Sequence, residues 1–140
     1  MMKIYAARIA YFGMAWLFVA MILGQVFLAG LALFAGTAWS AHRDMGHTIV
    51  LLPMVLLVLA WVGQVPRPAV RLAAVLFGLV IVQAEVFAAI RHQMPVVAAL
   101  HPVLALLVFT IGLALAWNAR SVVRVARPGR TVSAAAQTTL

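Results

Sequence analysis

The sequence contains no cysteine and only two acidic residues, Asp44 and Glu85. Without cysteine, the chain cannot form a disulfide, an iron–sulfur cluster or a thiolate metal site of its own. The sequence also has no paired carboxylates, no phosphate-binding loop and no zinc motif. Charged residues make up only 9% of the 140 residues, whereas 67% are hydrophobic. This composition excludes a soluble domain of this length and indicates a membrane protein.

Long uncharged runs divide the chain into four predicted membrane spans. A helix needs roughly 20 apolar residues to cross a bilayer core of about 30 Å. The run from Ile9 to Ala41 carries no charge and is about twice as long as a signal-peptide core, so we expect an uncleaved first span. Pro53 predicts a kink in the second span. The predicted spans are residues 11–36, 41–62, 69–90 and 95–117.

The basic residues predict the orientation of these spans. Eight of the ten fall on one side, and only Arg43 and Arg91 fall on the other. The eight are Lys3, Arg8, Arg67, Arg71, Arg120, Arg124, Arg127 and Arg130. We therefore expect a multi-pass protein of a bacterial cell membrane with both termini cytoplasmic and with residues 118–140 as a basic, partly disordered tail. Orientation and anionic lipid account for the charge of +8, so we expect the lipid bilayer as a partner and no nucleic acid.

An internal repeat relates the two halves of the chain. Gln25 and Gln83 each lie in an odd-numbered span, and each precedes a histidine, His42 or His101, by nearly the same separation. Both predicted hairpins begin on the same side, which indicates a parallel repeat about an axis along the membrane normal. The predicted fold class is therefore all-α: an integral membrane four-helix bundle over residues 1–117, made of two similar helical hairpins.

His42 and His101 are the candidate ligands of a haem. The repeat places them on opposite sides of its axis, and helical bundles build cofactor sites from side chains on facing helices. Two imidazoles across a bundle can bind the two axial positions of a haem iron. Gly46 and Ala105 follow them by four residues, on the same helix face, and leave room for a flat macrocycle. His92 lies in a predicted turn, where we expect a hydrated side chain.

Two further polar residues, His47 and Glu85, each have alternative roles. His47 points about 140° away from His42, at about 100° per residue. It is either a partner that orients a ligand or an interface residue, and its greater depth also makes it the alternative ligand to His42. Glu85 is the only acid inside a span. It is either a proton-relay or haem-edge carboxyl, or a carboxyl that is protonated or paired with Arg43 or Arg91.

Short motifs around the histidines resemble one four-helix half of haem A synthase. They are His42-Arg43, which opens a span, and the stretch Pro95–His101, which enters another. The halves of that enzyme hold haem between such histidines, so the resemblance implies a haem site with Arg43 beside it. Haem A synthase has two such halves and a glutamate just before its His-Arg pair, where this chain reads Thr-Ala-Trp-Ser-Ala at residues 37–41. The resemblance therefore extends to haem binding and not to the catalysis.

The chain also resembles an uncharacterised bacterial family of small four-helix membrane proteins. The matching elements are Gln25–Gly30, His42-Arg43 with Gly46, and Ala99-Leu100-His101. This second resemblance implies the same four-span architecture and names no activity.

Together, these patterns predict one haem b near the outer leaflet, with His42 and His101 as its metal ligands. A six-coordinate iron between two histidines has no open position for a substrate, so we expect electron transfer rather than an enzymatic reaction. The alternative function is a cofactor-free structural or accessory membrane subunit. A homodimer and a separate redox partner are both left open.

Overall fold

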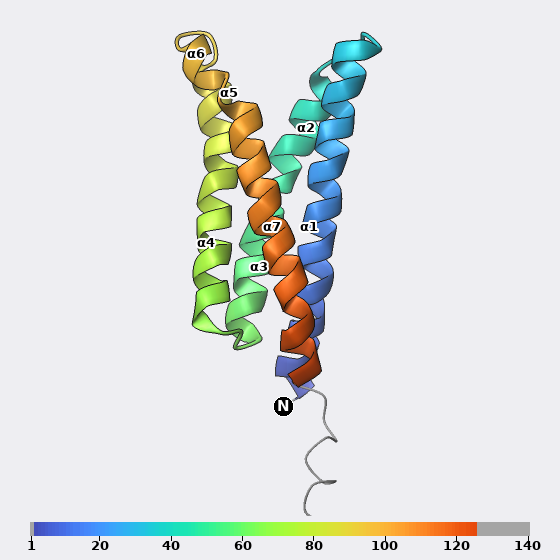
Figure 1. The fold of residues 1–140 in the computed structure, drawn as a ribbon, viewed down its shortest axis with the longest axis vertical. Coiled ribbons are helices and arrows are strands. Elements are labelled where there is room, and N and C mark those ends of the chain that lie inside the picture. The colour runs from blue at the N-terminus through green and yellow to red at the C-terminus, as the bar shows by residue number, and fades with distance from the viewer. Residues whose placement is uncertain (1, 126–140) are drawn as a thin grey trace, which may run out of the picture.

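The computed structural model describes residues 2–125, and these residues form a bundle of helices without a β-strand (Figure 1). The helical elements are α1 (Met2–Phe34), α2 (Ser40–Ile49), α3 (Leu51–Val62), α4 (Arg67–Ile81), the π-helix η1 (Val82–Val86), α5 (Phe87–Ile90), α6 (Pro95–Ala98) and α7 (His101–Val125). They join into four segments that are long and apolar enough to cross a membrane: Met2–Phe34, Ser40–Val62, Arg67–Ile90 and Pro95–Arg124. The all-α prediction is confirmed for the described part of the chain.

Two prolines account for the interruptions in the second and fourth segments. Pro53 has no N–H to donate to the carbonyl four residues earlier, and the helix is interrupted at Val50, between α2 and α3. Pro102 is the second residue of α7. Proline is favoured in the first turn of a helix and does not continue a preceding helix, so α6 ends and α7 begins just before it. Helix α7 continues to Val125 and so takes in the first residues of the expected tail. The remainder of that tail, residues 126–140, lies outside the described residues.

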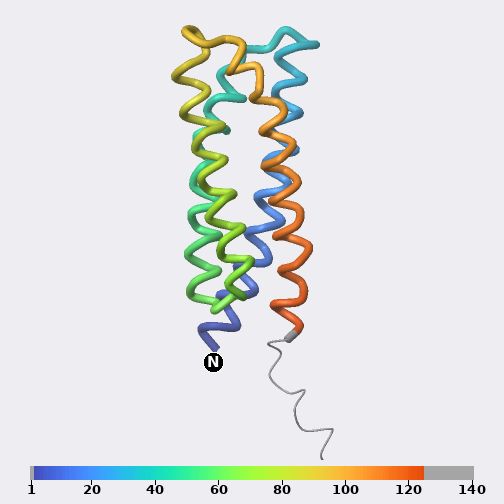
Figure 2. Tube along the Cα trace, turned by 60° about the vertical axis from the view of Figure 1, so that its left-hand side comes forward, coloured from blue at the N-terminus to red at the C-terminus, as the bar shows by residue number. Residues whose placement is uncertain are grey.

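The four segments run alongside one another, and their connections lie at two opposite ends (Figures 1 and 2). We call the end with Met2, the α3–α4 turn and the end of α7 the basal end, and the end with the α1–α2 and α5–α6 turns the apical end. Six basic residues lie toward the basal end: Lys3, Arg8, Arg67, Arg71, Arg120 and Arg124. Arg43 and Arg91 lie toward the apical end, and Arg127 and Arg130 fall outside the described residues.

Arg8 fastens the first hairpin at the basal end. Its Nε donates to the carbonyl of Gly63 at 2.7 Å, and its Nη2 donates to the carbonyl of Gln64 at 3.3 Å. The last carbonyls of a helix lack partners within the helix and carry partial negative charge. A guanidinium from α1 therefore caps the end of α3, where Gln64 turns the chain with a φ of 49°.

The buried core occupies the basal part of the bundle. Its largest fully buried side chains include Tyr11 and Phe18 of α1, Leu56 of α3, Leu76 of α4 and Leu115 of α7. On the apical side the core ends at Val19, Ile49, Val80 and Val108. No residue of 20–48 or 81–107 is buried. All four histidines lie in these two stretches, so the histidines gather in the part of the bundle that has no buried residue.

Candidate functional site

The structure brings His42 and His101 together in the apical half. His42 lies in the first turn of α2, and His101 is the first residue of α7. Their ring centroids are 6.2 Å apart, with 63° between the ring planes. Trp39 flanks the His42 ring at 5.6 Å, and Phe87 flanks the His101 ring at 6.2 Å. The two candidate ligands therefore face each other in a short row of aromatic rings. We call His42 and His101 the imidazole pair.

A backbone hydrogen bond fixes the tautomer of His42. Its Nδ1 lies 3.1 Å from the carbonyl oxygen of Gln25 on α1. A carbonyl oxygen only accepts, so Nδ1 must carry the hydrogen. In the neutral ring, this leaves the lone pair on Nε2 available. Metal-ligating histidines have the same arrangement, in which the nitrogen that does not bind metal donates to a carbonyl or a carboxylate.

The matching glutamine of the second half makes the reciprocal contact. Gln83 lies in the π-helix η1, and its Nε2 donates to the backbone carbonyl of His101 at 2.9 Å. This bond fixes the start of α7 against the third segment. π-Helical turns occur frequently at functional sites. The amide oxygens of Gln25 and Gln83 are both buried without a hydrogen-bond donor among the described residues. Each of the two hairpins thus carries a glutamine beside its histidine and an unpaired acceptor.

The other predicted cofactor-binding residues occupy different positions. Gly46 faces α1, and a Cβ placed on it would lie 3.0 Å from Nε2 of Gln25. The small size of Gly46 therefore makes room for this amide, a contact that the sequence did not predict. Ala105 lies one turn beyond His101 on α7 and is partly buried. Arg43 is exposed at the apical end.

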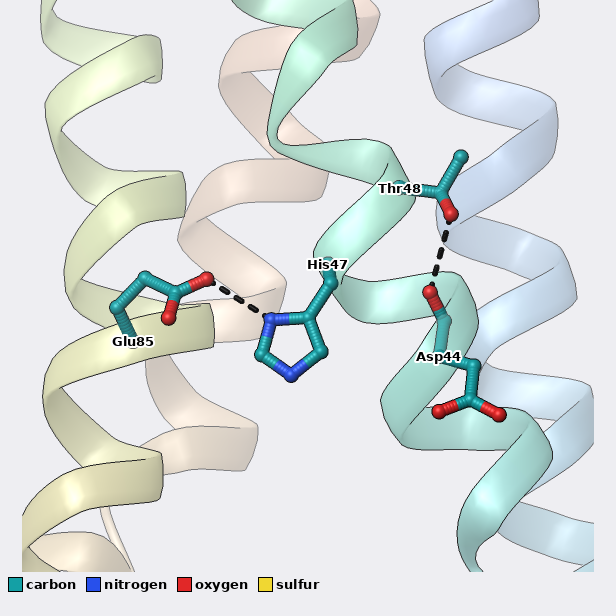
Figure 3. Close-up of polar contacts among 4 residues, drawn as sticks. All are labelled: Asp44, His47, Thr48 and Glu85. Atoms are coloured by element: carbon teal, nitrogen blue, oxygen red, sulfur yellow. Dashed lines mark hydrogen bonds and ion pairs between the residues drawn. The ribbon is translucent and has the colours of Figure 1, made fainter.

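His47 and Glu85 form a pair between α2 and η1 (Figure 3). His47 Nδ1 lies 2.9 Å from Glu85 Oε1, and the side chains are 55% and 52% exposed. The sequence paired Glu85 with Arg43 or Arg91 as one alternative, but Arg91 instead donates from its Nε to Nε2 of His92 at 3.1 Å. We call His47 and Glu85 the His–Glu pair. It lies on the same two segments as His42 and Gln83, and is therefore attached to both halves of the site.

The donor set narrows the kind of group that these residues can hold. In the part of the chain that the structure describes, no three His, Asp or Glu side chains lie close enough to hold a bare metal ion. A structural zinc site needs four protein ligands and a catalytic site three. Two facing imidazoles, by contrast, complete the coordination of a metal that already has a planar set of ligands, as a haem iron has. The imidazole pair therefore fits a haem better than it fits a free ion.

Comparison with known proteins finds a similarity to one family model and no activity. Residues 25–90 match the model of a family described as "Family of unknown function (DUF6220)". No curated protein and no solved structure matches the chain significantly. The match agrees with the expected resemblance to an uncharacterised family, and none of the findings links the chain to haem A synthase. The matched residues include Gln25, His42, His47 and Glu85, and they end before His101.

Proposed function

We propose that this protein binds one haem b between His42 and His101 and transfers electrons within a membrane. The observation that carries the proposal is the imidazole pair, with its ring centroids 6.2 Å apart. Metal–imidazole bonds are about 2 Å long, and a ring centroid lies roughly 1 Å beyond the bonding nitrogen, so rings on opposite sides of one iron have centroids about 6 Å apart. The 6.2 Å separation matches this distance, which supports His42 and His101 as the two ligands.

Each neighbouring residue has a definite part in this proposal. The Gln25 carbonyl holds His42 in the tautomer with Nε2 free. The Gln83 amide donates to the His101 carbonyl and so fixes the backbone position from which the second ligand extends. His42 and His101 would both hold the haem and leave no open position for a substrate, and the haem would supply a one-electron couple suited to electron transfer. A separate redox protein would supply or receive the electron, and a homodimer would place two copies of the site in one complex.

The simplest test is the visible spectrum of the purified protein. We expect a Soret band and a b-type α band that appears on reduction. Stoichiometric haem content, measured by the pyridine haemochrome method, should approach one per chain. Protein that is folded by circular dichroism and stays colourless after haem is added would refute the proposal and leave the cofactor-free accessory subunit as the better account.

We also propose the cell membrane of a bacterium as the location, with the basal end toward the cytoplasm. Six of the described basic residues lie at the basal end and two at the apical end, which is the asymmetry that favours a cytoplasmic base. The contacts of Gln25 with His42 and of Gln83 with His101 support the parallel repeat of two hairpins.

The orientation predicts the behaviour of reporter fusions. A reporter that is active only in the cytoplasm should be active when it is fused after Leu140. The same reporter should be inactive when it is inserted in the α1–α2 turn at Gly36, which belongs to the apical end. Activity at Gly36 with inactivity after Leu140 would reverse the orientation and move the imidazole pair to the cytoplasmic side.

The His–Glu pair is the proposed proton acceptor that accompanies reduction. An added electron is best balanced by a nearby proton, and ionisable groups inside a span are expensive unless they have such a use. Glu85→Gln removes an ionisable group while keeping its shape and its hydrogen-bonding capacity toward His47. We expect the pH dependence of the reduction potential to flatten, with the potential changing by some tens of millivolts.

Redox titration at several pH values measures this effect. Asp44→Asn is the matched control, because it removes the same charge from the exposed face of α2, where Asp44 accepts only through its backbone carbonyl, from Thr48 (Figure 3). If Glu85→Gln merely lowers expression and leaves the potential unchanged at every pH, the carboxyl has a packing role instead.

A further inference from the structure

The basal part of α7 carries a groove with an unusual arginine. The groove is shallow and open, and all of its lining residues belong to α7: Trp117, Asn118, Arg120, Ser121 and Arg124. The guanidinium carbon of Arg120 lies 4.4 Å from the centroid of the Trp117 ring and 5.3 Å from that of Trp16 on α1. Two indole rings therefore hold one guanidinium in place by cation–π attraction. Arg124 follows by one helical turn and lies on the same face.

This arrangement prepares Arg120 for an anion. Stacking uses the faces of a guanidinium and leaves the N–H groups at its edge free to donate. Because the two tryptophans hold the Arg120 side chain before an anion binds, binding costs less conformational entropy. Arg124 adds a second guanidinium, and Asn118 adds a neutral amide. Ser121 adds no donor, because its hydroxyl already donates to the Asn118 carbonyl at 2.7 Å.

No acidic residue competes for these arginines. The two acids of the whole chain are Asp44 on α2 and Glu85 in η1, and both lie in the apical half. The groove is thus a site of uncompensated positive charge with donors aimed by a fixed side chain. Arginine in such a setting matches the oxygens of a phosphate.

The surface next to the groove indicates what carries the phosphate. Trp117 is 61% exposed, and Leu113, Leu106 and Val103 continue an exposed apolar stripe up α7 from the groove. A ligand that covers both must have a phosphate at one end and a hydrocarbon at the other. Exposed tryptophan at the end of an apolar span is also typical of the headgroup level of a bilayer.

We propose that the α7 groove binds the phosphate of an anionic phospholipid, with Arg120 and Arg124 on the phosphate and the acyl chain along the apolar stripe. Basic pockets at the cytoplasmic end of membrane spans bind such headgroups. The site rests on the proposed cytoplasmic position of the basal end but not on the haem, so its test is separate from the test of haem binding.

A second groove in the same bundle provides the matched control. It lies between α3 and α4, has a volume of about 350 Å³, and is lined by Trp61, Arg67 and Arg71 among others. It lies at the same end and also contains one tryptophan and two arginines, but among the described residues neither of these arginines lies over two tryptophan rings. Arg71→Gln therefore removes the same charge as Arg124→Gln without touching the proposed site.

The experiment is native mass spectrometry of the full chain released from detergent with phosphatidylglycerol or phosphatidylcholine. We expect wild-type protein to retain phosphatidylglycerol preferentially. Arg124→Gln should weaken this binding about fivefold, while Arg71→Gln should weaken it much less. Circular dichroism should be unchanged, because Arg124 is exposed. Excess inorganic phosphate should not displace the lipid.

Three outcomes would overturn the proposal. Equal retention of the two lipids would show that the groove does not distinguish an anionic headgroup from a zwitterionic one. Equal losses in Arg71→Gln and Arg124→Gln would assign the binding to the general positive field of the basal end. Displacement by inorganic phosphate would assign the groove to a free anion rather than to a lipid.

Discussion

Replacing either His42 or His101 with alanine should abolish the six-coordinate b-type spectrum of the haem-loaded protein. Each substitution removes one axial nitrogen, and the opposite ring, 6.2 Å away by centroid, cannot occupy both sides of an iron. We expect loss of haem or a shift to a five-coordinate spectrum, which absorption and electron paramagnetic resonance spectra distinguish. The effect is close to all-or-none, and it is the largest that the proposed site predicts.

Two other histidines provide controls for this prediction. His92→Ala should leave the spectrum nearly unchanged, because His92 lies in the apical turn and contacts Arg91. His47→Ala should shift the reduction potential and keep the six-coordinate spectrum, as the loss of a nearby hydrogen-bonding residue does. If His47→Ala abolishes the spectrum and His42→Ala does not, then His47 is the ligand. If none of the four variants changes any spectrum, no histidine holds a haem.

Gly112→Ala should destabilise the bundle, whereas the same change at Gly78 should not. A Cβ at Gly112 on α7 would lie 2.7 Å from Cε1 and 2.8 Å from Cδ1 of Phe18, whose ring is fully buried on α1. Because the Phe18 ring is packed on all sides, it cannot move away from the new methyl group, and α1 and α7 must move apart instead. We expect a loss of about 1–3 kcal/mol in the free energy of unfolding, as for other overpacked cores.

Gly78→Ala is the control for this prediction. Gly78 lies on α4, and nothing lies within 4 Å of the position that its Cβ would take. Because glycine within a helix costs about 1 kcal/mol relative to alanine, this variant should be neutral or more stable. Unfolding of both variants in mixed detergent micelles with increasing dodecyl sulfate measures the difference. Equal stabilities would mean that α1 and α7 do not approach closely at Gly112.

Hydrophobic patterning was sufficient to predict the four helical segments. The length of an uncharged run predicts the length of the helical segment. A proline predicts where a helix is interrupted, and Pro53 predicted the interruption that the structure has at Val50. The π-helix η1 was not predicted, because five residues of such a turn read like any other apolar stretch. The extra residue in that turn changes which side chains face α2, so helical periodicity alone could not pair Glu85 with His47.

The candidate site was also predicted in part from the sequence. The matched positions of Gln25 and Gln83 predicted that His42 and His101 would face each other, because a repeat constrains long-range geometry. It did not predict the contacts of the glutamines themselves. Gly46 was expected to leave room for a flat macrocycle, and in the structure it faces the Gln25 amide. Such contacts depend on side-chain rotamers across two helices, which residue spacing does not encode.

The buried core, confined to the basal half, sets an order of assembly. Regions with few buried contacts open locally at much lower free energy than the whole domain unfolds. Backbone amides around Phe18, Leu56 and Leu115 should therefore exchange their hydrogens last, and those around His42 and His101 early. The helices can associate through their basal halves and still separate at their apical halves. If the proposed haem binds, it would then enter between already folded helices, as the last step of assembly.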